Sequence, residues 1–180
     1  CGALMIADEI QTGMGRTGSL LASPSLGAKP DVVVLAKSLG AGMPIGAFLA
    51  CGKAACAFEP GDHGSTFGGN HLACAAAYYV TDKLVSTNLL SHISEVGAYF
   101  IDRLNALKSH CPAITDVRGK GLMLGLEFAD GTSAKDIQQR LLSSGFVAAT
   151  AGANVLRFLP PYVIQRSHID SLIEVLKKLL

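Results

Sequence analysis

The sequence lacks the long apolar runs and the charge imbalance that define several classes of protein. No stretch of its 180 residues approaches the roughly 20 consecutive apolar residues that span a bilayer. Its formal net charge is only +1, which gives no sign of a nucleic-acid or membrane partner. Charged residues make up 16% of the chain, below the usual quarter, while apolar residues make up 49%. We therefore expect part of the apolar surface to be buried against a missing segment or a partner subunit.

Cysteine and histidine are present but are not spaced as metal ligands. The five cysteines form no Cys-x-x-Cys pair, and the five histidines are scattered along the chain. An odd number of cysteines in apolar or helical surroundings indicates free thiols in a reducing compartment. No basic segment precedes the apolar N-terminal residues, so the sequence shows no secretory signal. We expect no metal site and a cytoplasmic location.

One lysine stands at the end of a strongly apolar run. Residues 31–36 read Asp-Val-Val-Val-Leu-Ala and lead into Lys37, with Gly40 and Gly42 just beyond. Such a run predicts a buried strand that delivers the Lys37 amine into a pocket lined by backbone. Burial disfavours the charged ammonium, and Schiff-base chemistry needs the neutral amine. The alternative is a surface lysine whose stem lies along the end of the strand.

A second apolar run ends in two carboxylates. Residues 3–7 lead into Asp8 and Glu9, and the loop that follows at 12–18 contains three glycines. Strands of an open α/β sheet present polar groups to a ligand at their carboxyl ends. The spacing between Asp8 and Lys37 fits a strand, a crossover and the next parallel strand. A carboxylate and a lysine that meet there suit pyridoxal phosphate, because the lysine binds its aldehyde and the carboxylate keeps its ring nitrogen protonated.

Periodicity and propensity predict the remaining elements. Strands are expected over about 3–8, 31–36, 45–51, 116–128 and 146–159. The strand at 116–128 is expected to bend at Gly119 and Gly121, and the segment 146–159 is expected to form two short strands around Gly152. Helices are expected over about 19–27, 53–58, 70–85, 88–108, 133–143 and 167–180. Ser167 is expected to cap the last helix, with Asp170 in its first turn.

At these positions the sequence resembles the class III pyridoxal-phosphate aminotransferases. The resemblance is carried, in order along essentially the whole chain, by Asp-Glu-Ile-Gln-Thr-Gly at 8–13, the run at 30–37, Pro-Ile-Gly-Ala at 44–47, the loop at 58–70, Val-Arg-Gly-Lys-Gly at 117–121 and Asn-Val-Leu-Arg-Phe-Leu-Pro-Pro at 154–161. It implies an α/β architecture, the type I fold of pyridoxal-phosphate transferases. Residues 1–85 would be the C-terminal part of a large cofactor-binding domain, and residues 86–180 a small α+β domain. Family members are much longer, so we expect this chain to be their C-terminal half and incomplete for activity.

The resemblance also implies roles for the first motif. Asp8 would pair with the pyridinium nitrogen, and Gln11 would donate a hydrogen bond to the phenolic oxygen of the cofactor. Lys37 would be the Schiff-base lysine and then the base that moves the substrate proton. Glu9 and Ile10 are expected as further cofactor contacts. The alternatives are a carboxylate that caps the following loop for Asp8, and an ordinary loop side chain for Gln11.

Three further residues are expected to bind ligands in the family's manner. The glycine-rich loop at 63–70 would reach across a homodimer interface, so that Thr66 binds the phosphate of the neighbouring subunit's cofactor. Ser65 would contact an acylated amino-acid substrate. Arg157 would present its guanidinium to a substrate carboxylate, or else would pair with a structural glutamate.

The activity that the resemblance implies is transamination. N-acetylornithine and 2-oxoglutarate would be converted to N-acetylglutamate 5-semialdehyde and glutamate, a step of arginine biosynthesis. Two alternatives stay open. One is another ω-amine donor, such as ornithine or succinylornithine, and the other is a structural fragment without activity.

Overall fold

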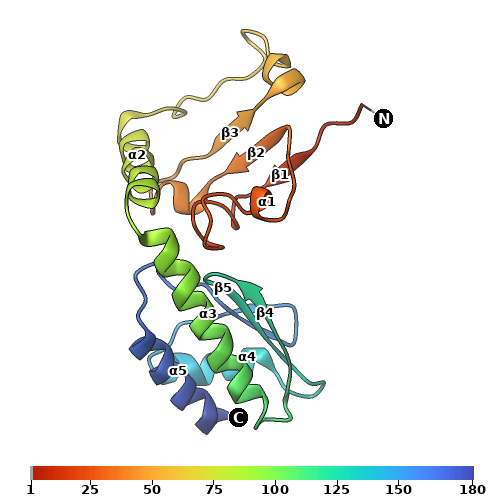
Figure 1. The fold of residues 1–180 in the computed structure, drawn as a ribbon, viewed down its shortest axis with the longest axis vertical. Coiled ribbons are helices and arrows are strands. Elements are labelled where there is room, and N and C mark those ends of the chain that lie inside the picture. The colour runs from red at the N-terminus through yellow and green to blue at the C-terminus, as the bar shows by residue number, and fades with distance from the viewer. Residues whose placement is uncertain (1) are drawn as a thin grey trace. The chain divides into compact units, whose positions relative to one another are not determined.

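The structure is a computed structural model that describes residues 2–180. The chain divides into two compact units, one ending at Leu90 and the other beginning at Ser91. The boundary predicted from the sequence is at residue 85. Each unit has its own sheet: a three-stranded sheet of order β1-β2-β3 in the first, and a four-stranded sheet of order β4-β5-β7-β6 in the second (Figure 1).

The first unit is built on a mixed sheet. β1 (Ile6–Asp8) runs parallel to β2 (Val32–Leu35), as predicted, and β3 (Ala47–Ala50) is antiparallel to β2. Val32, Val33 and Leu35 of β2 are buried and Val34 is half-buried, which explains the apolar run in the sequence. The crossover from β1 to β2 holds only a four-residue helix, α1 (Ala22–Ser25), because Gly27 at φ 75° ends it after one turn.

Two 3₁₀ segments and one α-helix complete the first unit. η1 (Lys37–Leu39) follows β2, and η2 (Gly52–Cys56) follows β3. The alanine-rich segment forms α2 (His71–Ser86), close to the predicted bounds. Asn70 caps it, since its Oδ1 accepts a hydrogen bond from the Ala73 N–H at 2.9 Å.

The second unit packs helices on an antiparallel sheet. Its strands are β4 (Ile114–Lys120), β5 (Met123–Phe128), β6 (Ala149–Ala151) and β7 (Val155–Phe158). Its helices are α3 (Leu89–Lys108), α4 (Ala134–Ser143) and α5 (Arg166–Leu179). The strand predicted over 116–128 is therefore a hairpin, which turns at Gly121 with φ 57°.

Alternate residues of the second sheet form the core of this unit. The buried sheet residues include Ile114, Leu124, Leu126, Phe128, Leu156 and Phe158, and the buried helix residues include Ile93, Phe100, Leu104, Ile137, Leu141, Ile169 and Ile173. Phe100 of α3 and Phe158 of β7 have ring centroids 5.3 Å apart. The residues between the buried ones on β5 and β7 point to the other face of the sheet.

The start of α5 corrects one sequence prediction. The capping residue is Gln165, not Ser167, and its backbone N–H donates a hydrogen bond to Nδ1 of His168 at 3.2 Å. The cap therefore lies two residues earlier than predicted, because a glutamine and a histidine form a capping box that the usual Ser-x-x-Glu pattern does not reveal.

Asp170, expected only in the first turn of α5, instead joins that helix to α3. Its Oδ1 accepts a hydrogen bond from the Tyr99 hydroxyl at 2.6 Å and lies 2.9 Å from Nε of Arg103. The hydrogen bond to the Asp170 carboxylate raises the pKa of Tyr99 above its ordinary value. None of the helices formed by residues 2–180 has the length and apolar character needed to cross a membrane.

Candidate functional site

The two residues predicted to do the chemistry lie at one edge of the first sheet. Asp8 is the last residue of β1 and is paired with Val34 of the parallel strand β2. The Glu9 N–H extends this ladder with a 3.0 Å hydrogen bond to the Val34 carbonyl. Lys37 opens η1, just beyond the end of β2. Since the carboxyl ends of parallel neighbours meet at the same edge, the fold brings Asp8 and Lys37 to a common edge.

Lys37 has an unusual backbone conformation. Its φ is 46°, in the left-handed region that costs a residue other than glycine about 1 kcal/mol or more. The turn that follows depends on Gly40, where a Cβ atom would lie 2.1 Å from the Met43 carbonyl oxygen. Strain of this kind is concentrated at functional sites.

The enclosure predicted for the Lys37 amine is not present within the described residues. The Lys37 side chain is exposed, although β2 is buried. The left-handed residue turns the chain out of the strand, so its side chain leaves the buried row. Residues 2–180 alone therefore do not enclose the Lys37 amine, and the backbone-lined pocket stays a prediction.

Asp8 uses one carboxylate oxygen within its own loop. Its Oδ1 accepts a hydrogen bond from the Ile10 N–H at 3.0 Å, which is the loop-capping role considered as the alternative. The side chain is exposed, and Oδ2 has no hydrogen-bond partner among residues 2–180. One oxygen therefore orients the carboxylate and the other remains available for a ligand.

Glu9 is the most highly connected residue of the motif. It is only 3% exposed, and its carboxylate accepts hydrogen bonds from the N–H groups of Ala22 at 2.5 Å and Ser23 at 2.7 Å. The Ser23 hydroxyl donates a third, at 2.5 Å. These bonds hold the glycine-rich loop and the first turn of α1 against β1. The carboxylate expected to contact a cofactor is therefore engaged in positioning Asp8 and the loop.

A stability measurement can verify this role of Glu9. Glu9→Ala should lower the free energy of unfolding by about 3 kcal/mol, because three donors would lose a charged acceptor in a buried site. Urea denaturation of the complete protein measures the loss. Glu59→Gln, at an exposed loop carboxylate, is the control and should change stability by less than about 0.5 kcal/mol. Equal effects of the two substitutions would contradict the role assigned to Glu9.

Ile10 and Gln11 occupy the tight turn after β1, and both are half-buried. The Gly13 N–H donates to the Glu9 carbonyl at 2.9 Å. A Cβ atom at Gly13 would lie 2.8 Å from both that carbonyl oxygen and Cδ2 of Leu35, so only glycine fits there. This close approach keeps Gln11 beside the ends of β1 and β2.

The glycine-rich loop brings Ser65 to the connection between η1 and β3. Ser65 lines a cavity of about 370 Å³ together with residues 44–46 and 67–70. Its Oγ accepts a hydrogen bond from the Gly68 N–H at 2.9 Å. Thr66 is exposed and does not line this cavity. The structure therefore places Ser65, but not Thr66, in a concave surface of the first unit.

Aromatic contacts at the start of this loop could not be predicted from the sequence. The Phe58 ring lies edge-on to His63, with centroids 5.1 Å apart, and to Phe48 of β3, with centroids 5.5 Å apart. At the other end, Nδ2 of Asn70 donates to the Phe67 carbonyl at 3.0 Å. These contacts fix the ends of the segment that carries Ser65 and Thr66.

Arg157 lies in the second unit, on β7, between Gly125 of β5 and Ala149 of β6. Its Nε is buried and has no hydrogen-bond partner among residues 2–180. The alternative of a pairing with a structural glutamate is therefore not seen in the described part of the chain. In the same sheet, Arg118 of β4 does bind carboxylates: it donates to Asp116 at 2.7 Å and also to Glu127.

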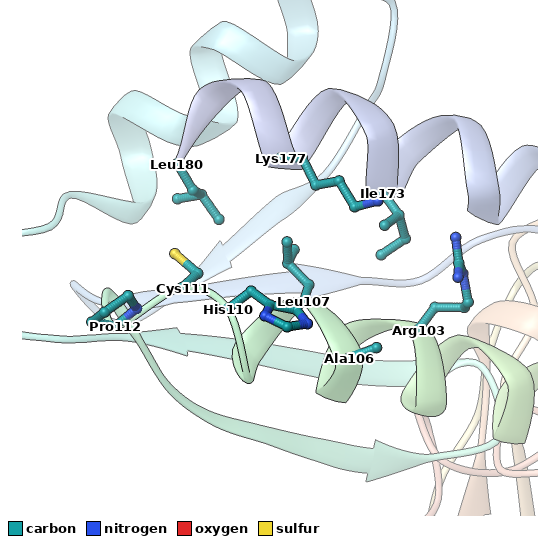
Figure 2. Close-up of a pocket in the computed structure, with 9 residues that line it drawn as sticks. All are labelled: Arg103, Ala106, Leu107, His110, Cys111, Pro112, Ile173, Lys177 and Leu180. Atoms are coloured by element: carbon teal, nitrogen blue, oxygen red, sulfur yellow. The ribbon is translucent and has the colours of Figure 1, made fainter.

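A cavity of about 560 Å³ between α3 and α5 contains none of the predicted site residues (Figure 2). Figure 2 shows Arg103 extending from α3 toward α5. The arginine and the lysine that line this cavity are both paired with carboxylates. Arg103 is paired with Asp170, and Lys177 is paired with Glu174 at 2.7 Å. Within residues 2–180 no cluster of three or more His, Cys, Asp or Glu side chains could hold a metal ion.

Comparison with known proteins gives a consistent result over the whole chain. Residues 1–180 match the family model described as aminotransferase class-III. The acetylornithine aminotransferase of Methanothermobacter thermautotrophicus is 45% identical over 173 residues, which are 96% of this chain and 44% of that protein. The acetylornithine aminotransferase of Aquifex aeolicus is 48% identical over 177 residues, 98% of this chain and 45% of that protein. The chain thus spans less than half the length of these relatives.

Solved structures agree with this result. The chain superposes on the ornithine delta-aminotransferase of Plasmodium falciparum with a TM-score of 0.91 and 36% identity, over 98% of this chain and 46% of that one. For the acetylornithine aminotransferase of Elizabethkingia anophelis the TM-score is 0.90 and the identity 36%, over 98% of this chain and 45% of that one.

Proposed function

This chain belongs to the class III aminotransferase family, and from that premise we propose that it is the C-terminal half of a pyridoxal-phosphate-dependent aminotransferase. The observation that carries the proposal is the common edge at which β1 ends in Asp8 and β2 leads into the strained Lys37. Residues 1–85 would belong to the large domain and residues 86–180 to the small one. The compact units that meet at residues 90 and 91 support this division.

The donor set at this edge fits pyridoxal phosphate. The Lys37 side chain is exposed, so its amine is accessible to an aldehyde. Oδ2 of Asp8 is the acceptor that a protonated ring nitrogen needs, and the Gln11 amide can donate to the phenolic oxygen. When bound, the cofactor would supply an electron sink for the carbon that loses its proton. Lys37 would then hold and return that proton, while Glu9 keeps the Asp8 loop in place.

The substrate pair that we propose is N-acetylornithine with 2-oxoglutarate. The support is the name shared by the relatives in Methanothermobacter and Aquifex, which are 45% and 48% identical to this chain. Ser65, in the cavity beside residues 44–46, would contact the acylated donor. Arg157, with its buried and unpartnered Nε, would bind a substrate carboxylate. We place the enzyme in the cytoplasm.

A different donor is the second candidate. The structure of an ornithine delta-aminotransferase superposes as well as that of an acetylornithine aminotransferase, with TM-scores of 0.91 and 0.90. The half reaction of the complete enzyme decides between them. Conversion of the cofactor absorbance by N-acetylornithine at low concentration, with ornithine much less effective, supports the first candidate. The reverse order of effectiveness would replace it by the second.

We also propose a homodimer whose active sites are shared. Thr66 is exposed, does not line the cavity that holds Ser65, and has no hydrogen-bond partner within the described residues. It would bind the phosphate of the neighbouring subunit's cofactor. Large exposed apolar side chains of the first unit, such as Phe67, Leu72 and Tyr78, are suited to such an interface.

Mixing two inactive variants tests the shared site. Lys37→Ala and Thr66→Val subunits, each inactive alone, should regain activity when unfolded together and refolded. In the mixed dimer one site would carry both substitutions, while the other would keep its own Lys37 and the intact Thr66 of its partner. At most about a quarter of wild-type activity is expected, since half the dimers are mixed and each has one intact site. No recovery on mixing would mean that Thr66 serves its own subunit.

A further inference from the structure

At one glycine of the second unit, neither the backbone conformation nor the space around a Cβ atom requires a glycine. Gly125 lies inside β5, between Arg118 of β4 and Arg157 of β7. Its φ is outside the left-handed region, and a Cβ atom there would lie 3.4 Å from Cγ1 of Val155 and 3.8 Å from Cγ of Arg118, which is ordinary van der Waals contact. Gly119, in contrast, has a φ of 141° that side chains rarely adopt. A glycine inside a strand lowers the stability of that strand, so its presence at position 125 calls for another reason. The remaining reason is the open space left by the absent side chain.

This open space belongs to a cavity beside Arg157. The cavity has a volume of about 260 Å³ and is lined by residues of all four strands or their turns: Arg118, Gly119, Met123, Gly125, Ala151, Val155 and Arg157. Residues paired directly across neighbouring strands point to the same face, with Cβ atoms about 5 Å apart. A side chain at position 125 would therefore stand next to the stem of Arg157. The volume is just below that of common ligand pockets, which suits one end of a small substrate.

The two arginines that line this cavity differ in whether their guanidinium donors already have hydrogen-bond partners. Arg118 is engaged by the carboxylates of Asp116 and Glu127, and these hydrogen bonds raise the pKa of the Arg118 guanidinium while that of the Asp116 carboxyl is lowered. Arg157 has no such partner within residues 2–180, and its Nε is buried. Arg157 is therefore the cation with donors free for an incoming carboxylate.

We propose that Gly125 determines substrate access to Arg157, by keeping open the side of the guanidinium at which a substrate carboxylate binds. The inference rests on the carboxylate-binding role proposed for Arg157. A methyl group at position 125 narrows this space, and the branched side chain of valine fills it. The alanine substitution does not require the backbone to move, because the added Cβ meets its neighbours at normal contact distance.

Equilibrium binding of 2-oxoglutarate to the complete holoenzyme tests this inference. Gly125→Val should raise the dissociation constant at least about tenfold, and Gly125→Ala should raise it severalfold, because both fill space that the ligand needs. Thr150→Val is the matched control: Thr150 pairs with Leu156 and faces the other side of the same sheet. It should leave the dissociation constant unchanged. The thermal midpoint of each variant verifies that the sheet is intact.

The outcomes separate this inference from the proposed function. An unchanged dissociation constant in both folded Gly125 variants overturns the role of Gly125, even where borohydride still traps the cofactor on Lys37. A raised constant supports that role whether or not the Lys37 adduct is found, since the adduct reports only on the cofactor. Should Gly125→Val fail to fold, the severalfold effect of Gly125→Ala decides.

Discussion

Replacing Lys37 by alanine is expected to abolish transamination by the complete enzyme. The same substitution should remove the borohydride-trapped cofactor from the peptide that contains residue 37, because Lys37 is the lysine of η1, the turn that follows β2. Peptide mapping of the reduced protein measures the adduct, and a coupled assay of glutamate formation measures the rate. Survival of the adduct in Lys37→Ala would move the attachment point to another lysine and remove the basis of the proposed site.

Lys53 is a matched control for this experiment. Like Lys37, it is exposed and lies in a 3₁₀ segment directly after a strand, in this case η2 after β3. Lys53→Ala should keep both the adduct and the rate. Lys37→Gly adds a second readout, since it relieves the strained φ of 46° and should raise the free energy of unfolding by about 1 kcal/mol while activity is lost. A gain in stability would show that the backbone at residue 37 is strained, while the loss of activity follows from the loss of the amine.

The elements that were predicted well are those whose signal is local. The buried run of β2 and the helical spacing in α3 depend on residues near one another in sequence, and their bounds agree with the prediction to within a few residues. A bend at Gly119 and Gly121 was predicted, but the full reversal that makes β4 and β5 a hairpin was not, because the alternation of side chains continues through the turn. Gly121, with a φ of 57°, lies in the two-residue turn between the paired residues Lys120 and Met123, and a side-chain period of two does not reveal this reversal.

The candidate site likewise has a part that could be predicted from the sequence and a part that could not. The edge shared by Asp8 and Lys37 follows from two apolar runs and one crossover, which the sequence displays. The role of Glu9 does not, because its partners Ala22 and Ser23 are brought to it only by folding. The carboxylate partners of Arg118 could not be predicted either, since its contact with Glu127 depends on the register of β4 against β5.

Asp8 is the second residue whose replacement should have a large effect. Asp8→Asn keeps an oxygen that can accept the Ile10 N–H, so the loop and the thermal midpoint should change little. The variant removes the negative charge that would keep the cofactor ring nitrogen protonated. We expect the rate of transamination to fall by about a thousandfold or more, as when a preorganised charge is removed from an active site.

Asp31 allows the charge of Asp8 to be separated from its structural role. The Asp31 carboxylate also binds a backbone group, accepting the Met5 N–H at 2.8 Å, but it stands ahead of β2, at the opposite end of the sheet from Lys37. Asp31→Asn should therefore leave the rate within a few-fold of wild type. A thousandfold loss in Asp8→Asn alone, measured in single turnovers with N-acetylornithine, assigns the effect to charge at the cofactor. Near-normal turnover in Asp8→Asn would leave Asp8 as a loop cap, and the cofactor's ring nitrogen would need another partner.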